Sequence, residues 1–153
     1  MDDFDDLMEI LSDPESMSFY QAPFDADRVK DWIKWSIDSY ATHGCGLWAV
    51  VLKETNECIG DCGITVQEIE GEAVRELGYH IKKSSSGNGF ATEAALGARN
   101  YGFETLGFKR IVSYMNAKNL ASRRVAEKNG MRFVKEFEKN GIRQVLYKTT
   151  KSD

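Results

Sequence analysis

The chain contains segments in which hydrophobic residues recur every three or four positions and segments in which they form short runs. Helical spacing, as in Phe4, Leu7 and Leu11, predicts helices over residues 2–11, 25–40, 89–106 and 120–129. Apolar runs bounded by turn residues predict strands over residues 47–52, 58–66, 72–81, 111–115, 132–138 and 142–148. Asn140-Gly141 favours a two-residue hairpin turn between the last two strands. Because helices and strands are interleaved, we expect an α/β fold with a mixed sheet.

The composition fits one domain that spans residues 1–153. With 42% hydrophobic residues, a chain of 153 residues can bury one full core, and no stretch resembles a linker or a repeat. No apolar run approaches the ~18 residues of a membrane span, and the acidic start of the chain is unlike a signal peptide. We therefore expect a cytoplasmic protein without membrane contact. A net charge of −4, without interleaved basic and aromatic residues, speaks against a nucleic-acid surface.

Charge is distributed unevenly along the chain. Residues 1–27 contain acidic residues but neither Lys nor Arg, whereas basic residues outnumber acidic ones over residues 109–153. Both regions can be ordinary solvated surface. Alternatively, the basic region attracts the phosphates of a cofactor and the acidic region attracts a cationic substrate.

Cys45, Cys58 and Cys62 are expected to be free, buried thiols. Their odd number on a chain without an export signal fits a reducing compartment. The spacing of Cys58 and Cys62 allows a zinc site with His43 or His80, but no second Cys or His pair follows, and the surrounding pattern predicts a strand. We expect no metal.

Residues 86–92 read Ser-Gly-Asn-Gly-Phe-Ala-Thr and join a predicted strand to a predicted helix. A glycine-rich turn that opens a helix directs free backbone N–H groups and the positive end of the helix dipole at one point, which suits a phosphate. Gly87 and Gly89 carry no β-carbon, so an anion can approach the backbone. The loop lacks the Gly-Lys-Ser/Thr of a P-loop and fits the dinucleotide fingerprint only in part. The sequence therefore predicts a site for a phosphorylated cofactor, with a simple tight turn as the alternative.

The chain reads ELGYHIKKSSSGNGFATEA over residues 76–94, RIVS over 110–113 and NLASRRVAEKNGM over 119–131. These motifs, in this order, resemble the GNAT superfamily of acyl-coenzyme A N-acyltransferases. Within it, the pattern is similar to the branch of the ribosomal-protein N-terminal acetyltransferases. The resemblance covers residues 5–148. The pyrophosphate loop of this family reads Q/R-x-x-G-x-G/A, and here Ser86, Gly89 and Ala91 stand at its three positions, so one usual phosphate contact is in doubt.

The resemblance implies a GNAT-like mixed central sheet, flanked by helices, in which two parallel strands splay apart. Residues 76–81 and 111–115 would form these two strands. Family members normally begin with a strand before the first helix, and here the chain begins in that helix. Either the chain starts inside the ancestral domain, or the first strand is dispensable and the strand over residues 47–52 becomes an open edge, which a homodimer could cover.

The resemblance also implies acetyl-coenzyme A as the co-substrate. Its pyrophosphate would be held by the loop, which comprises Ser86, Gly87, Asn88, Gly89, Phe90, Ala91 and Thr92. Its pantetheine arm would lie between the splayed strands, against the backbone of Tyr79, His80 and Ile81, where an N–H could also stabilise the oxyanion. Asn119 would contact the cofactor, although it is also a good N-cap for the helix that follows.

Two residues match the catalytic positions of this branch. Ser122 would protonate the leaving thiolate, directly or through water, since no Tyr follows the Asn119 motif; it could equally be an ordinary first-turn residue. Glu76 would take the proton from the acceptor through water. His80 shares the face of Glu76 by two-residue alternation and is the alternative base, with solvent as a third. Either side chain could instead be a satisfied polar residue of the sheet.

The predicted function is transfer of an acetyl group from acetyl-coenzyme A to a primary amine by direct attack in a ternary complex. The acceptor would be a peptide N-terminus or a small cationic molecule. Trp32, Trp35 and Tyr40 fall in the helix that overhangs the acceptor site in this family, although such aromatic residues more often belong to the core. The alternative is a module that binds acyl-coenzyme A without turnover, because Ser86, the absent first strand and the absent Tyr depart from the family pattern.

Overall fold

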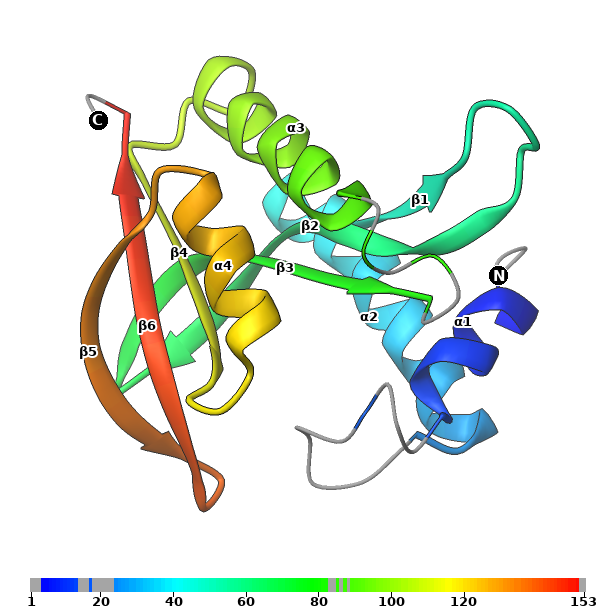
Figure 1. Cartoon of the computed structure of the whole chain (residues 1–153), viewed down its shortest axis with the longest axis horizontal. Coiled ribbons are helices and arrows are strands. Elements are labelled where there is room, and N and C mark those ends of the chain that lie inside the picture. The colour runs from blue at the N-terminus through cyan, green and yellow to red at the C-terminus, as the bar shows by residue number, and fades with distance from the viewer. Residues whose placement is uncertain are drawn as a thin grey trace.

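The computed structural model describes residues 4–13, 17, 24–82, 85, 87 and 89–151 (Figure 1). The helices are α1 (Phe4–Leu11), α2 (Ala26–His43), α3 (Phe90–Glu104) and α4 (Leu120–Lys128). The strands are β1 (Leu47–Val51), β2 (Cys58–Ile69), β3 (Glu72–Ile81), β4 (Arg110–Asn116), β5 (Arg132–Lys139) and β6 (Ile142–Thr150). Each predicted helix and strand is found at its expected place, so the predicted α/β class is confirmed.

The strands form one six-stranded sheet in the order β1-β2-β3-β4-β6-β5. Neighbouring strands are antiparallel except β3 and β4, which are parallel. This parallel pair is in register only at Glu76 and Val112, and the two strands diverge beyond that point (Figure 1). The predicted mixed sheet with splayed parallel strands is therefore confirmed.

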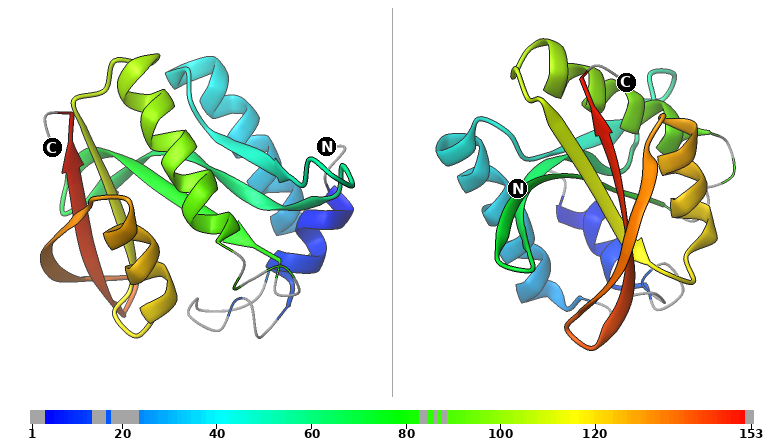
Figure 2. Two further views of the ribbon diagram at one scale, coloured as in Figure 1. Left: turned by 45° about the horizontal axis from the view of Figure 1, so that its top comes forward. Right: turned by 90° about the vertical axis from the view of Figure 1, so that its left-hand side faces the viewer.

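Helices cover both faces of the sheet. The right-hand view of Figure 2 shows α1 and α2 on one side of the sheet and α3 and α4 on the other. The main core lies beneath α3 and α4 and includes Ile64, Leu77, Ile111 and Val145, each almost completely buried. A second cluster joins α1 to α2. The two helical layers hold the central strands from opposite sides, and β3 presents alternate side chains to each layer.

Local sequence explains where several elements begin and end. The side chain of Asp25 accepts a 2.8 Å hydrogen bond from the backbone N–H of Arg28 and so caps α2, which Gly44 ends with a φ of 74°. The predicted hairpin turn is confirmed, because Asn140 and Gly141 have φ values of 53° and 78°. Two successive positive φ angles are what a two-residue hairpin turn of type I′ requires.

Four strands, β2, β4, β5 and β6, are longer than the sequence predicts, and β2 differs most. The strand expected over residues 58–66 continues to Ile69 and pairs with β3 from Gly60 to Ile69. It ends at Glu70-Gly71, whose φ values are 50° and 82°. Because glutamate rarely adopts a positive φ, the residue pattern carries no strong signal for this turn.

Four further expectations concern the edge of the sheet, the thiols, a membrane span and a metal site. β1 is an edge strand of the described sheet, and its coverage by a homodimer stays a prediction. Cys45, Cys58 and Cys62 are buried thiols, as predicted. Within the described ranges no helix is long and apolar enough to span a bilayer. Nor do three or more His, Cys, Asp or Glu side chains of the described residues gather as metal ligands.

Candidate active site

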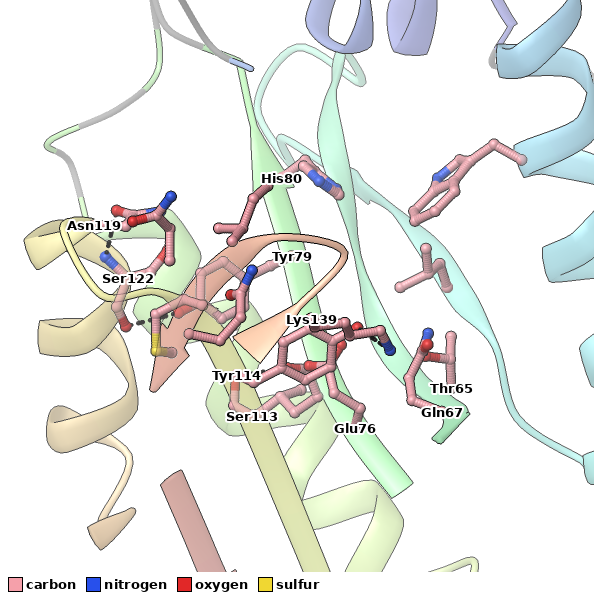
Figure 3. Close-up of a pocket in the computed structure, with 18 of the residues that line it drawn as sticks. Thr65, Gln67, Glu76, Tyr79, His80, Ser113, Tyr114, Asn119, Ser122 and Lys139 are labelled. Carbon is pink, nitrogen blue, oxygen red and sulfur yellow. Dashed lines mark hydrogen bonds between the residues drawn. The ribbon is translucent and has the colours of Figure 1, made fainter. Parts of the chain in front are cut away.

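A cleft of about 280 Å³ opens where β3 and β4 diverge (Figure 3). Its walls come from α2, the first turn of α4, the parallel strands and the β5–β6 hairpin. Five residues that the sequence singles out line this cleft, namely Glu76, Tyr79, His80, Asn119 and Ser122. Residues distant in sequence therefore meet around one space.

The gap between the strands begins just beyond a side-chain bridge. The hydroxyl of Ser113 on β4 donates a 2.8 Å hydrogen bond to the carbonyl oxygen of Leu77 on β3, and both residues are buried. After this bridge, residues 78–80 and 114–116 line opposite walls of the cleft. An extended ligand in this gap can meet strand backbone on both of its sides.

The wall that α4 forms carries hydroxyl and amide groups (Figure 3). The side-chain oxygen of Asn119 accepts a 3.2 Å hydrogen bond from the backbone N–H of Ser122, so Asn119 is the N-cap of α4. Tyr79 reaches this helix from β3, and its hydroxyl donates a 2.9 Å hydrogen bond to the carbonyl oxygen of Ser122. Two residues with hydroxyl groups, Tyr79 and Ser122, thus lie together at this wall.

The opposite wall, toward α2, contains a histidine–carboxylate pair. Nδ1 of His80 lies 2.9 Å from Oδ1 of Asp61, and Nε1 of Trp32 donates a 3.0 Å hydrogen bond to Oδ2 of the same carboxylate. Asp61 is only 2% exposed. Trp32 also contacts the rings of Phe24 and Trp35, which extend this wall as an aromatic surface. His80 is therefore held between a fixed carboxylate and the cleft.

Glu76 lies in the same cleft but in a drier environment. Burial raises the pKa of its carboxyl well above the ordinary value, and the positive charge of Lys139 offsets only part of this effect. Its buried Oε2 has no hydrogen-bond partner among the described residues. A β-carbon on Gly78 would come within 3.2 Å of Oε1, so glycine at this position leaves room for the carboxyl. Its surroundings therefore favour the protonated form of the Glu76 carboxyl over the ionised form.

The glycine-rich loop precedes α3. Gly87 and Gly89 have φ values of 82° and 78°, which glycine adopts without strain. Gly89 is the N-cap of α3, and no described side chain caps this helix end. The first amides of α3 are therefore left to bind a ligand, because they have no carbonyl partner within the helix.

Comparison with known proteins accounts for this arrangement. The pattern of the acetyltransferase (GNAT) domain matches residues 1–132. The chain belongs to the GNAT acetyltransferase family. The protein YkkB of Bacillus subtilis (strain 168) is 36% identical over 130 residues, which are 85% of this chain and 76% of that protein. The uncharacterized N-acetyltransferase p20 of Bacillus licheniformis is 31% identical over 138 residues, 89% of this chain and 76% of p20.

A solved structure of a related protein shows the same fold. The crystal structure of an acetyltransferase from Agrobacterium tumefaciens str. C58 is 28% identical and superposes with a TM-score of 0.86, covering 99% of this chain and 86% of that one. Membership of the GNAT family makes this protein an acyl-CoA-dependent acetyltransferase. The predicted family, fold and enzyme class are therefore confirmed.

The sequence-predicted residues of this GNAT enzyme divide into two groups. The first group lines the cleft and consists of Glu76, Tyr79, His80, Asn119 and Ser122. The other described candidates do not line the cleft and lie at the end of β3 or around the start of α3, namely Ile81, Gly87, Gly89, Phe90, Ala91 and Thr92. Ser86 and Asn88, also predicted to bind the cofactor, lie outside the described residues.

Sequence reasoning missed the partner of His80. Asp61 stands opposite His80 in the β2–β3 ladder, which follows the turn at Glu70-Gly71. Every pair from Ile69 and Glu72 onward is set by that two-residue turn, so recognising the turn would have identified Asp61.

The described acidic residues of α1 do not line the cleft. Asp5, Asp6 and Glu9 on α1 are absent from the described residues that line the cleft. Arg28, Glu76 and Lys139 are the lining residues with acidic or strongly basic side chains. Attraction of a cationic substrate by α1, if it operates, therefore acts from a distance.

Proposed function

We propose that this enzyme transfers the acetyl group of acetyl-coenzyme A to a primary amine by direct attack within a ternary complex. The observation that carries the proposal is the two-walled cleft between β3 and β4. One wall has the hydroxyl-bearing residues Tyr79 and Ser122, and the other has the His80–Asp61 pair beside aromatic rings. A reaction in which a thiolate leaves on one side and an amine enters from the other needs this division.

In this proposal the loop before α3 holds the pyrophosphate. The positive φ angles of Gly87 and Gly89 and the uncapped start of α3 support it, because they direct backbone N–H groups toward an anion. The pantetheine arm then lies along β3 at residues 79–81 and enters the gap beyond the Ser113 bridge. This path brings the thioester to the cleft.

The leaving thiolate is protonated at the α4 wall. Ser122 is the proton donor that the family pattern favours, and the hydroxyl of Tyr79 lies beside it. Asn119 holds the first turn of α4 in place through its cap and lines the cleft next to Ser122. Its cofactor contact is compatible with this capping role, because an amide can also donate hydrogen bonds.

The acceptor is a primary amine, either a peptide N-terminus or a small cationic molecule. Support comes from Trp32 and Trp35, since a protonated amine is attracted to the face of an indole ring. The aromatic wall lies on the side of the cleft away from α4, where an acceptor would approach the thioester.

The test is a thiol-release assay with acetyl-coenzyme A and a panel of acceptors. The panel contains N-terminal peptides, polyamines, amino sugars and amino acids, with N-acetylated peptides as matched controls. We expect release with at least one primary amine and none with its acetylated form. Binding of acetyl-coenzyme A without release across the whole panel would instead indicate a module without turnover.

A further inference from the structure

The pairing of Asp61 and His80 has the geometry of a base and its orienting group. Both oxygens of the Asp61 carboxylate are engaged, one by the His80 ring at 2.9 Å and one by the Trp32 indole N–H at 3.0 Å. Asp61 lies in β2, and its two partners come from the neighbouring strand β3 and from helix α2. Since the carboxylate is almost fully buried, its position is fixed by them.

This contact also determines which nitrogen of His80 can accept a proton. A carboxylate only accepts hydrogen bonds, so we assign the hydrogen of the neutral ring to Nδ1, which faces Asp61. Nε2 then carries the lone pair. When Nε2 takes a proton, the carboxylate stabilises the imidazolium that forms.

The place of His80 in the fold puts it on the acceptor side. Its ring lies against Trp32 of the aromatic wall, with ring centroids 5.7 Å apart, and the residue lines the cleft. Along β3 it shares a face with Glu76, whereas Tyr79 points to α4 on the other side of the sheet. An amine that reaches the thioester from the aromatic wall therefore passes His80.

Glu76 is less suited to the same task. Burial raises the pKa of its carboxyl well above the ordinary value, so the ionised form that could accept a proton is disfavoured. Among the described residues, the charged or aromatic groups in contact with His80 are Asp61 from β2 and the indole of Trp32 from α2. Arg28 from α2, Glu76 from β3 itself and Lys139 from β5 share its cleft. Among them, only Asp61 is a carboxylate in direct contact with the ring.

We propose that His80 is the general base of this acetyltransferase and that Asp61 is its positioning residue. The inference rests on the proposed amine acetylation. Nε2 of His80 takes one proton from the ammonium form of the acceptor, and the freed lone pair attacks the thioester carbonyl. The C–N bond forms, the C–S bond breaks, and the second amine proton goes to the thiolate at the α4 wall. The imidazolium then releases its proton to solvent, so each turnover yields an amide, a free thiol and one proton.

Kinetics of two variants test both roles. For the wild type we expect kcat/KM to rise with pH to a plateau as His80 becomes neutral. His80→Gln should lower the plateau by about 10²- to 10⁴-fold and abolish this rise, the range expected for loss of a general base. Asp61→Asn keeps the side-chain shape but removes the negative charge beside the ring, so the midpoint of the pH profile should move to lower pH. Asp38→Asn, an exposed change on α2, controls for loss of one negative charge.

Proton NMR gives a readout that does not need turnover. The chain has two histidines, and exposed His43 in the last turn of α2 serves as an internal reference. Asp61→Asn should move the titration midpoint of the His80 ring downward and leave that of His43 in place. A thermal melt with and without acetyl-coenzyme A shows that each variant is folded and binds cofactor. Should Asp61→Asn not fold, the His80→Gln arm decides the base.

The outcomes separate this inference from the proposed function. An active wild type whose His80→Gln variant stays within threefold of its rate, with the same pH midpoint, overturns the base alone. If Asp61→Asn leaves the midpoints of the pH profile and of the His80 NMR titration unchanged, Asp61 is a structural residue and its positioning role is overturned. A wild type that binds acetyl-coenzyme A but acetylates no amine overturns the proposed function and the base together.

Discussion

The phenol of Tyr79 on β3 donates a hydrogen bond to the backbone carbonyl of Ser122 on α4. This contact links β3, which borders the gap between the parallel strands, to α4. It also brings two hydroxyl-bearing residues to one wall of the cleft. A hydroxyl next to a leaving thiolate can supply its proton, so the two side chains compete for one role in the proposed reaction.

Single substitutions at this wall separate the two hydroxyls. Ser122→Ala removes one hydroxyl but keeps the carbonyl that Tyr79 uses. If Ser122 is the donor, steady-state kinetics should show a kcat at least about 10-fold lower with little change in the KM for acetyl-coenzyme A. Tyr79→Phe should destabilise the fold by about 1 kcal/mol in urea denaturation, because one partly buried hydrogen bond is lost. A loss of kcat in Tyr79→Phe alone would assign the proton to the phenol.

Gly89→Glu should abolish the rise in melting temperature that acetyl-coenzyme A produces. The new carboxylate would stand where the pyrophosphate is proposed to bind, and a ligand that binds only the folded state stabilises it by mass action. Gly89→Ala is the matched control, since it imposes the same strain at a φ of 78° without a charge. Both variants should melt lower without ligand, and only the Ala variant should keep a ligand-dependent rise. A normal ligand-dependent rise in the Glu variant would show that the pyrophosphate does not bind to this loop.

Glu76 should make the protein less stable as pH rises. Burial raises its pKa in the folded state above the ordinary 4.5, so between these two values the folded state binds a proton that the unfolded state has released. The free energy of unfolding then falls with rising pH from about 4.5, by up to ~1.4 kcal/mol per unit from this group. Glu76→Gln cannot titrate and should lack this loss. Urea denaturation of both proteins between pH 5 and 8 measures it, and parallel curves would show that Glu76 ionises freely.

Joint replacement of Asp5, Asp6 and Glu9 by neutral residues should change the acceptor KM less than twofold at physiological ionic strength. These side chains are not among the described lining residues of the cleft, and exposed charges are screened over ~8 Å at this salt concentration. The KM for a cationic acceptor is compared at low and physiological salt. A several-fold rise in KM at both would show that α1 contributes to the acceptor site itself.

Much of this fold is readable from the residue pattern because local rules determine its elements. Asn140-Gly141 marks a hairpin by chemistry that few other dipeptides have, and the structure has that turn. The helices over residues 89–106 and 120–129 follow from spacing and from the Gly residues that end them. The splayed pair of strands came instead from family resemblance, since no local pattern encodes how two strands diverge.

The wall of the cleft toward α2 was harder to predict, because it depends on contacts between residues that are distant in sequence. Asp61 reads as one polar residue in an apolar strand, and its meaning appears only when the β2–β3 register places it opposite His80. That register follows from Glu70-Gly71, where glutamate adopts a conformation that its side chain disfavours. The bond from Trp32 depends further on how α2 is rotated over the sheet. Periodicity shows which side of a helix is apolar, but it does not show which atom of the sheet an indole will meet.

The turn at residues 140–141 has a consequence for the shape of the cleft. Lys139 and Gln144 line the cleft from the two arms of this hairpin, and Lys139 also donates a 3.3 Å hydrogen bond to the hydroxyl of Tyr114. Insertion of one residue here would shift β5 by one position along β6 and turn its inward side chains outward. A change in the length of one surface turn can therefore reshape the cleft, while the residues of its other walls stay as they are.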